Sequence, residues 1–173
     1  FYPNYFVIDD SYRCVWTLSE FPKSTEQLAL LSALGEKEDV TVRIYTRQVS
    51  EEDKRRILTN AFNKNRLKSN ETNVNDKIEA EMDITDQVSL MSNIARNNEP
   101  LLHTAVYLEM IGKDKADLES KQLEVEGELN NYGISFRRLN LRQREGFRCI
   151  APGGFNALGD QYERILPASS VAN

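Results

Sequence analysis

The only histidine of this chain, His103, is the side chain best suited to acid–base chemistry at neutral pH. It lies within an apolar stretch that predicts a β-strand, on the same face as Tyr107. The sequence places no aspartate or cysteine beside it that would make it the base of a nucleophile. We therefore favour a packed or hydrogen-bonded histidine, and keep an enzyme that uses the His103 face as an alternative.

Two pairs of residues have the chemistry of a metal site. Asp9 and Asp10 are adjacent carboxylates, but aspartate is a frequent turn former, so we favour a hairpin turn there. Cys14 and Cys149 lie far apart and outside any CxxC pattern. They therefore indicate neither a metal site nor a disulfide framework, and they favour a reducing, cytosolic environment.

Motifs of nucleotide-binding and hydrolytic enzymes are missing from the sequence. There is no Walker A, GxSxG, HExxH or GxGxxG pattern. Gly153, Gly154 and Gly159 are too loosely spaced to cradle a phosphate, and no Lys-Ser or Lys-Thr follows them. We predict no catalytic, cofactor-binding or metal-binding residue in this fragment, and hence no enzyme activity of its own.

One basic cluster stands out in an acidic chain of net charge -5. It consists of Arg137, Arg138, Arg142, Arg144 and Arg148. The cluster could face phosphate, an acidic surface of a partner or lipid headgroups, and we predict these five residues as partner-facing. The other interpretation, which we slightly favour from the sequence, is a solvated helix face that pairs with the carboxylates of residues 114–128. The negative net charge argues against a general nucleic-acid binder.

The totals fit one globular domain, since 40% of the 173 residues are hydrophobic and 28% are charged. The longest apolar run, 28–34, is far shorter than the ~20 residues of a membrane span. Asp9 and Asp10 stand where a signal peptide would not tolerate them. Because Phe1 is not an initiator methionine, we expect a piece of a longer protein.

Alternation and helical periodicity predict the elements that position these residues. The predicted strands are 5–8, 13–21, 39–48, 101–111 and 134–139, and the predicted helices are 24–34, one from Ser50, one over about 74–95, and 114–132. Ser24 with Gln27 forms a capping box for the first helix. Residues 68–75 predict a polar loop. In helix 114–132 we expect Leu118, Val125, Leu129 and Tyr132 to face inward.

This order predicts an α/β (α+β) fold, a ferredoxin-like β-α-β-β-α-β sandwich. It would have two helices on one face of an antiparallel sheet, and a helical hairpin inserted at about residues 50–98. Residues 1–142 would form this domain. An RNA-recognition module is not favoured, because the strand LLHTAVYLEM has one aromatic and lacks the required glycine pattern.

The last thirty or so residues carry a family resemblance. Gln143–Phe147, Ala151–Gly154 and Arg164–Asn173 resemble the end of the N-terminal domain in VirB/TrbE-type ATPases, the motors of type IV secretion and conjugative transfer. In that family a Q-x-x-(G/A)-F helix leads to a Pro-Gly turn, and an Arg-x-Leu-Pro segment leads into a RecA-like motor. The family turn more often reads Leu-Pro-Leu-Gly, whereas this chain has Ala-Pro-Gly-Gly. Over the remaining residues the likeness is one of architecture.

The resemblance implies that residues 143–173 connect a docking domain to an absent ATPase domain, where ATP and Mg would bind. It implies a cytoplasmic protein, peripheral at the inner face of the bacterial cell membrane. Its partners would be type IV secretion channel and inner-membrane subunits, together with other copies of itself. Nucleic acid is not a favoured partner. The alternative is a stand-alone ferredoxin-like binding module for nucleic acid or a small ligand.

Overall fold

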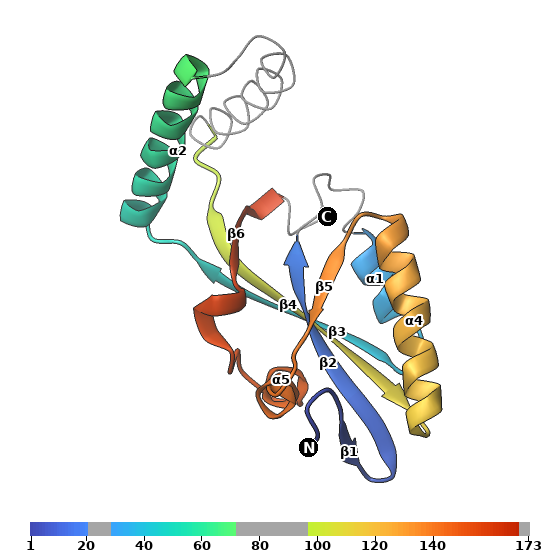
Figure 1. Cartoon of the computed structure of the whole chain (residues 1–173). Helices are drawn as coiled ribbons and strands as arrows, with labels where there is room; N and C mark the ends of the chain where they lie inside the picture. Colours follow the sequence, from blue (N-terminus) through green and yellow to red (C-terminus); the bar gives the residue numbers. More distant parts are fainter. Residues whose placement is uncertain (21–28, 72–96, 170–173) are drawn as a thin grey trace.

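The computed structural model describes residues 1–20, 29–71 and 97–169 (Figure 1). The elements in chain order are β1 (Phe6–Ile8), β2 (Ser11–Glu20), α1 (Ala29–Gly35), β3 (Val40–Gln48), α2 (Glu51–Glu71), β4 (Leu101–Gly112), α4 (Lys115–Asn131), β5 (Ser135–Arg138), α5 (Gln143–Ile150), the short 3-10 helix η2 (Gly159–Tyr162) and β6 (Arg164–Pro167). The fold is therefore mixed α+β, as the sequence predicts.

A six-stranded antiparallel sheet is built around β4. Along one edge β4 pairs with the whole of β3. Along its other edge it pairs with β2 through residues 107–112 and with β6 through residues 101–104. The far edge of β2 carries β1 near its start and β5 near its end. The long strand β4 therefore lies between strands on both sides, as expected of a central strand.

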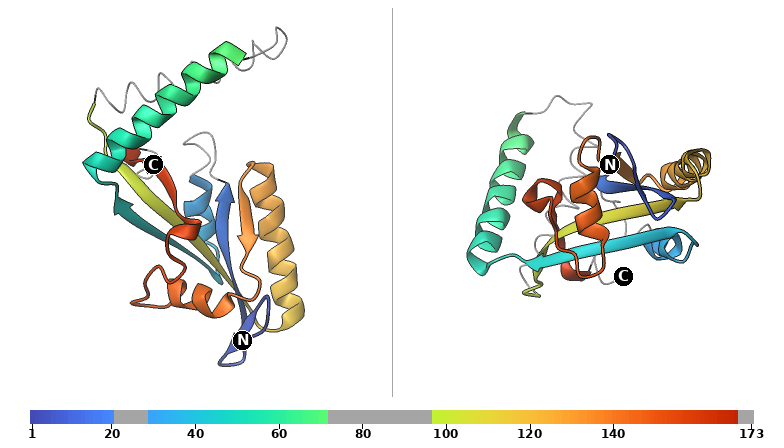
Figure 2. Two further views of the ribbon diagram at one scale, coloured as in Figure 1. Left: turned by 60° about the vertical axis from the view of Figure 1, so that its left-hand side comes forward. Right: turned by 90° about the horizontal axis from the view of Figure 1, so that it is seen from below.

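One face of the sheet is covered by α1 and α4 (Figure 2). Cys14, Trp16 and Leu18 alternate toward this face, as predicted, and pack with α4 through Leu118 and Val125. Asp114 caps α4 by accepting a hydrogen bond from the Asp117 N–H. The prediction that Tyr132 faces inward is wrong. Its side chain is 48% exposed, because α4 ends at Asn131 and Tyr132 is the C-cap residue.

The opposite face of the sheet is covered by α5 and the segment that follows it (Figure 2). Val15 and Tyr107 of the sheet form a second core with Cys149, Ile150 and Leu158. We expected two helices on one face and a connecting segment after residue 142. Residues 143–158 instead complete the fold as a further layer, because the apolar side chains on this face of β2 and β4 require cover.

Several local predictions concern turns and helix ends. Asp9 and Asp10, with φ of 46° and 65°, form the hairpin turn between β1 and β2, which confirms the turn over a metal site. Ser50 caps α2, since its Oγ accepts from the Asp53 N–H at 3.1 Å. The predicted loop at 68–75 begins too early, because α2 continues through Glu71.

Other predictions fall on residues outside the described ranges. They are the capping box of Ser24 and Gln27 and the second helix of the inserted hairpin, at about 74–95. Among the helices of the described ranges, none combines the length and the apolarity that crossing a membrane requires.

Candidate functional site

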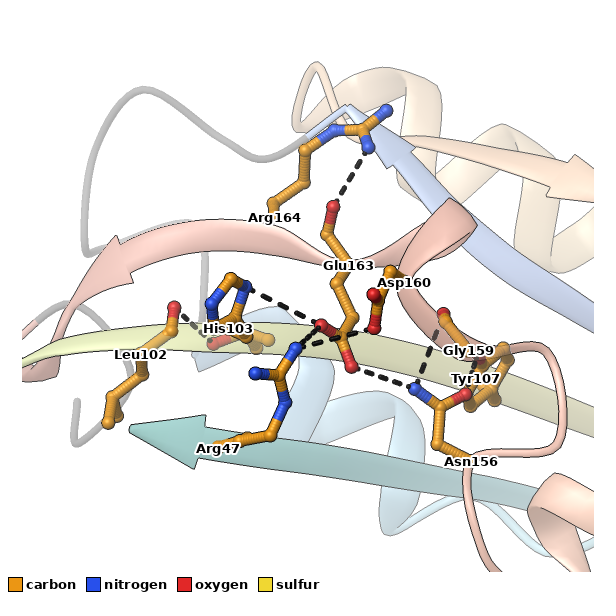
Figure 3. A network of polar contacts seen from close by, with 10 residues as sticks. Arg47, Leu102, His103, Tyr107, Asn156, Gly159, Asp160, Glu163 and Arg164 are labelled. Atoms are coloured by element: carbon orange, nitrogen blue, oxygen red, sulfur yellow. Dashed lines mark hydrogen bonds and ion pairs between the residues drawn. The ribbon is translucent and has the colours of Figure 1, made fainter. Parts of the chain in front are cut away.

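A buried carboxylate, Glu163, joins the C-terminal segment to the sheet (Figure 3). It lies between η2 and β6, and its side chain is 11% exposed. Its Oε2 is 2.8 Å from Arg47 Nη2 on β3 and 3.5 Å from His103 Nδ1 on β4. Asn156 donates from Nδ2 to Oε1 at 3.1 Å. The carboxyl group of Glu163 therefore lies against a guanidinium, an imidazole and an amide.

His103 occupies the middle of this cluster because three strands meet there. In register it lies between Arg47 of β3 and Ile165 of β6. Its side chain is 23% exposed and packs beside Glu163. The structure thus places the sequence-predicted histidine in a polar contact, and the partner is a carboxylate 60 residues further along the chain.

Tyr107 extends the cluster toward the second core. Its hydroxyl donates to Asn156 Oδ1 at 2.6 Å. Burial, followed by the nearby Cys149 thiol, raises the pKa of the Tyr107 hydroxyl far above its usual range, so the group remains a donor. Among the described residues, no group of three or more His, Cys, Asp or Glu side chains is arranged to hold a metal ion. The contacts of Glu163 with Arg47 and His103, and of Asn156 with Tyr107, hold residues 156–166 against β3 and β4.

Gln143, the first residue of α5, provides a second anchor. Its Oε1 accepts from the Val15 N–H at 2.8 Å, and its Nε2 donates to Val15 O at 3.0 Å and to Leu139 O at 3.1 Å. Val15 lies on the outer edge of β2, between the stretches that pair with β1 and β5. The Gln143 side-chain amide therefore forms hydrogen bonds with the backbone N–H and C=O of Val15, which pair with neither β1 nor β5.

Close packing brings α5 onto the sheet. A Cβ added at Gly146 would lie 2.9 Å from Leu139 Cδ1 and 3.0 Å from Val15 Cβ, so a larger residue would have to displace one or both side chains. Tyr45 of β3 donates from its hydroxyl to the Cys149 carbonyl at 2.7 Å. Neither Gln143 nor Gly146 has a predicted structural role from the sequence alone. Their spacing of three residues, with Cys149 three further on, is the signal for one buried helix face.

The five predicted partner-facing arginines do not share one surface. Arg138 points to the α4 face, where it pairs with Glu126 at 3.2 Å and lies over the Trp16 ring. Arg137 is opposite Thr17 in the register and points to the other face. The pairing that we expected with the carboxylates of residues 114–128 is therefore made by Arg138.

The other three arginines belong to the start and the exposed side of α5. Arg142 donates to Gln161 Oε1 at 2.6 Å and lies over the Tyr162 ring. Arg144 and Arg148 are exposed and one helical turn apart, so they share a face. Within the described residues neither of these two forms an ion pair, and the same holds for the exposed Arg137 on β5. Arg144 and Arg148 differ from Arg137 in that they share one helix face.

The two cysteines are buried on opposite faces of the sheet. Gln122 donates to Cys14 Sγ at 3.0 Å, and burial raises the pKa of the Cys14 thiol to about 12. Burial also raises the pKa of the Cys149 thiol. Both groups are therefore protonated at neutral pH and poorly reactive as nucleophiles.

No protein-family model matches this chain, and no curated protein matches it.

Proposed function

We propose that this chain is a non-catalytic docking domain of a type IV secretion or conjugation ATPase. In this proposal it joins the motor to membrane-channel components and to other copies during DNA or protein transfer. The protein would act in the cytoplasm, at the inner face of the bacterial membrane. ATP and Mg would bind in a separate motor domain of the parent protein.

The observation that carries the proposal is the way in which residues 143–167 are held. The segment that carries the family resemblance is fixed at one end by Gln143 and at the other by Glu163, and it finishes as β6 in the sheet. A docking domain must transmit the position of the partner to the motor. A segment with buried anchors at both ends suits that task better than a flexible linker.

The strand order lends further support to the ferredoxin-like part of the proposal. Four of the six strands follow the order β5–β2–β4–β3, and the three pairings that join them are antiparallel. The helices α1 and α4 connect β2 to β3 and β4 to β5, on one face. This is the order that a β-α-β-β-α-β sandwich requires. In the proposal, β1, α5 and β6 are additions to that framework.

The exposed face of α5 is the surface that we assign to a channel partner. Arg144 and Arg148 present two guanidinium groups on one side of a helix whose other side is buried. Guanidinium groups recognise carboxylates with defined geometry. The proposed partner therefore carries an acidic surface.

Sequencing the parent gene beyond the codon for Asn173 tests the family assignment. We expect a GxxxxGK[ST] motif in the residues that follow, and its absence would overturn the assignment. Incubation of the chain with ATP and Mg²⁺ provides a second test. We expect no turnover, and measurable hydrolysis would contradict the non-catalytic role.

Charge reversal tests the docking surface in the full-length parent protein. Arg144→Glu combined with Arg148→Glu should reduce transfer at unchanged protein abundance, whereas Arg137→Glu, on β5, should leave it unchanged. Equal effects of both changes would contradict the assignment of α5. A salt-dependent shift of single-stranded DNA that Arg142→Ala and Arg144→Ala abolish would favour a nucleic-acid-binding module instead.

A further inference from the structure

β3 forms one outer edge of the sheet. It pairs with β4 along its whole length, and no strand within the described residues pairs with its other side (Figure 1). The strand is nine residues long, its register has no bulge, and its sequence, VTVRIYTRQ, contains neither proline nor lysine. Proteins usually protect such edges with short strands, bulges, proline or charged side chains, above all lysine. Of these devices β3 has only two charged side chains, Arg43 and Arg47.

The hydrogen-bond pattern identifies which backbone groups of β3 point outward. The Val49 N–H donates to Leu101 O at 2.8 Å, and the Ile111 N–H donates to Asp39 O at 2.9 Å. In an antiparallel pair the bonded residues alternate, so the odd-numbered residues of β3 bond to β4. The N–H and C=O groups of Val42, Ile44 and Thr46 therefore point away from the sheet. Ile44, at the centre of this edge, is 45% exposed.

We infer that a second copy of this chain pairs with β3 in antiparallel orientation, with the two-fold axis at Ile44. In this register Ile44 of each copy forms a bonded pair with Ile44 of the other. Val42 of each copy pairs with Thr46 of the other. All outward-pointing groups then find partners, and the two sheets become one continuous sheet.

The charges of β3 favour this register over its neighbour. With the axis at Ile44, Arg43 lies opposite Tyr45 and Arg47 lies opposite Thr41 of the other copy. Moving the axis to Tyr45 also satisfies the backbone alternation. It would place Arg43 directly opposite Arg47, twice in the dimer, and like charges opposite each other destabilise a sheet. The strand is thus self-complementary with the axis at Ile44 and not with the axis at Tyr45.

This inference specifies the self-association that forms part of the proposed function, and it rests on the proposal only in that respect. Docking to a channel partner is assigned to α5, on another part of the molecule. A chain that stays monomeric would overturn the pairing of β3 and leave the channel-docking proposal standing. Loss of the ATPase assignment would leave the pairing of β3 standing.

Sedimentation equilibrium or light scattering over a range of concentrations tests the pairing. We expect a monomer–dimer equilibrium. Ile44→Pro removes an outward N–H without touching the bonds to β4, and Ile44→Lys places two cations opposite each other. Each should weaken the dimer at least about tenfold, which corresponds to about 1.4 kcal/mol. Leu123→Lys, at an exposed leucine of α4 (69% exposed), is the matched control and should have no effect.

Cysteine crosslinking tests the register and does not depend on how the proline variant folds. Ile44→Cys should form an intermolecular disulfide, because bonded partners lie ~5.5 Å apart at Cα, within disulfide range. Thr46→Cys should not, because the two copies of residue 46 would be about four residues, or ~13 Å, apart along the strands. A monomer at all concentrations overturns the inference. Preferential crosslinking of Thr46→Cys, or a dimer unaffected by Ile44→Lys, overturns it as well.

Discussion

Replacing Gln143 with leucine should strongly destabilise the fold, because the side-chain amide completes the backbone hydrogen bonds of β2. Leucine has a similar volume and is apolar, so it keeps the packing of α5 and removes only the polar contacts. Leu139 O would still accept from the Arg142 N–H at 3.2 Å. The Val15 N–H and the Val15 carbonyl would lose the partners that Gln143 gives them.

The magnitude follows from those two backbone groups. A buried donor or acceptor that loses its partner costs about 1–3 kcal/mol. Gln143→Leu should therefore lower the free energy of unfolding by about 2–6 kcal/mol. That is a large part of the ~5–15 kcal/mol that stabilises a typical domain.

Urea unfolding followed by the fluorescence of Trp16, the single, buried tryptophan, measures this change. The same substitution at the exposed Gln161, in the same C-terminal segment, is the matched control and should cost less than about 1 kcal/mol. Amide exchange adds a local measurement, since the Val15 N–H should lose its protection in Gln143→Leu.

Gln143→Glu separates hydrogen bonding from packing. A carboxylate can accept from the Val15 N–H but repels the carbonyls of Val15 and Leu139. Burial should therefore raise its folded-state pKa above the unfolded value, so stability should recover as the pH falls through that pKa. If Gln143→Leu costs no more than the change at Gln161, or if Gln143→Glu is indifferent to pH, the reasoning is refuted.

Three further predictions use the same unfolding assay or a thiol reagent. Gly146→Ala should destabilise by about 1–3 kcal/mol, because its Cβ would crowd Leu139, whereas Gly127→Ala on the open side of α4 should stabilise by up to about 1 kcal/mol. Burial raises the pKa of Glu109, on β4, above its value in the unfolded chain, so the free energy of unfolding should increase as the pH falls through the folded-state pKa. Glu109→Gln should therefore stabilise the protein at pH 7, and this stabilisation should shrink at acid pH. A thiol reagent at pH 8 should leave Cys14 unmodified until the chain unfolds, because burial raises its pKa to about 12.

For each of these three predictions, one experimental result would contradict it. Equal effects of alanine at Gly146 and Gly127 would show that α5 has room to move off the sheet. A pH-independent gain from Glu109→Gln would show that the carboxyl group keeps its ordinary pKa in the fold. Rapid labelling of Cys14 in the native state would show that the sheet opens beneath α4.

The strands could be predicted because successive side chains of a strand point to opposite faces of the sheet, so one short stretch of sequence shows the polarity of both faces. Cys14, Trp16 and Leu18 identify one face of β2, and Val15 identifies the other. The layer that covers the second face was not predicted, because the Gly- and Pro-rich composition of residues 143–173 is typical of a connection. Composition is a local property, whereas α5 is anchored on strand residues far away in the sequence, such as Val15, 128 positions before Gln143, and Tyr45, 104 positions before Cys149.

The polar cluster shows the same limit. His103 was recognised as a candidate, but Glu163 and Arg47 were not connected with it. Arg47 reaches it through the register of β3 on β4, and Glu163 reaches it only because β6 returns to the sheet. Register between distant strands depends on the packing of the whole domain. Residue type and spacing therefore predicted a packed or hydrogen-bonded His103 without predicting its partner.

Residues 50–100 leave and re-enter the sheet at neighbouring strand residues. Val49 and Leu101 are bonded to each other, and Lys54 Nζ meets Asn98 Oδ1 at 3.0 Å just outside that pair. The hydrogen bonds between β3 and β4 thus continue up to the point where the insertion begins. Doubling the length of a flexible insertion at such a point would lower the free energy of unfolding by only about 0.6 kcal/mol, the added cost of loop closure. In evolutionary terms this is a site where a lineage can lengthen, shorten or replace a segment, and acquire new partners, while the sheet stays the same.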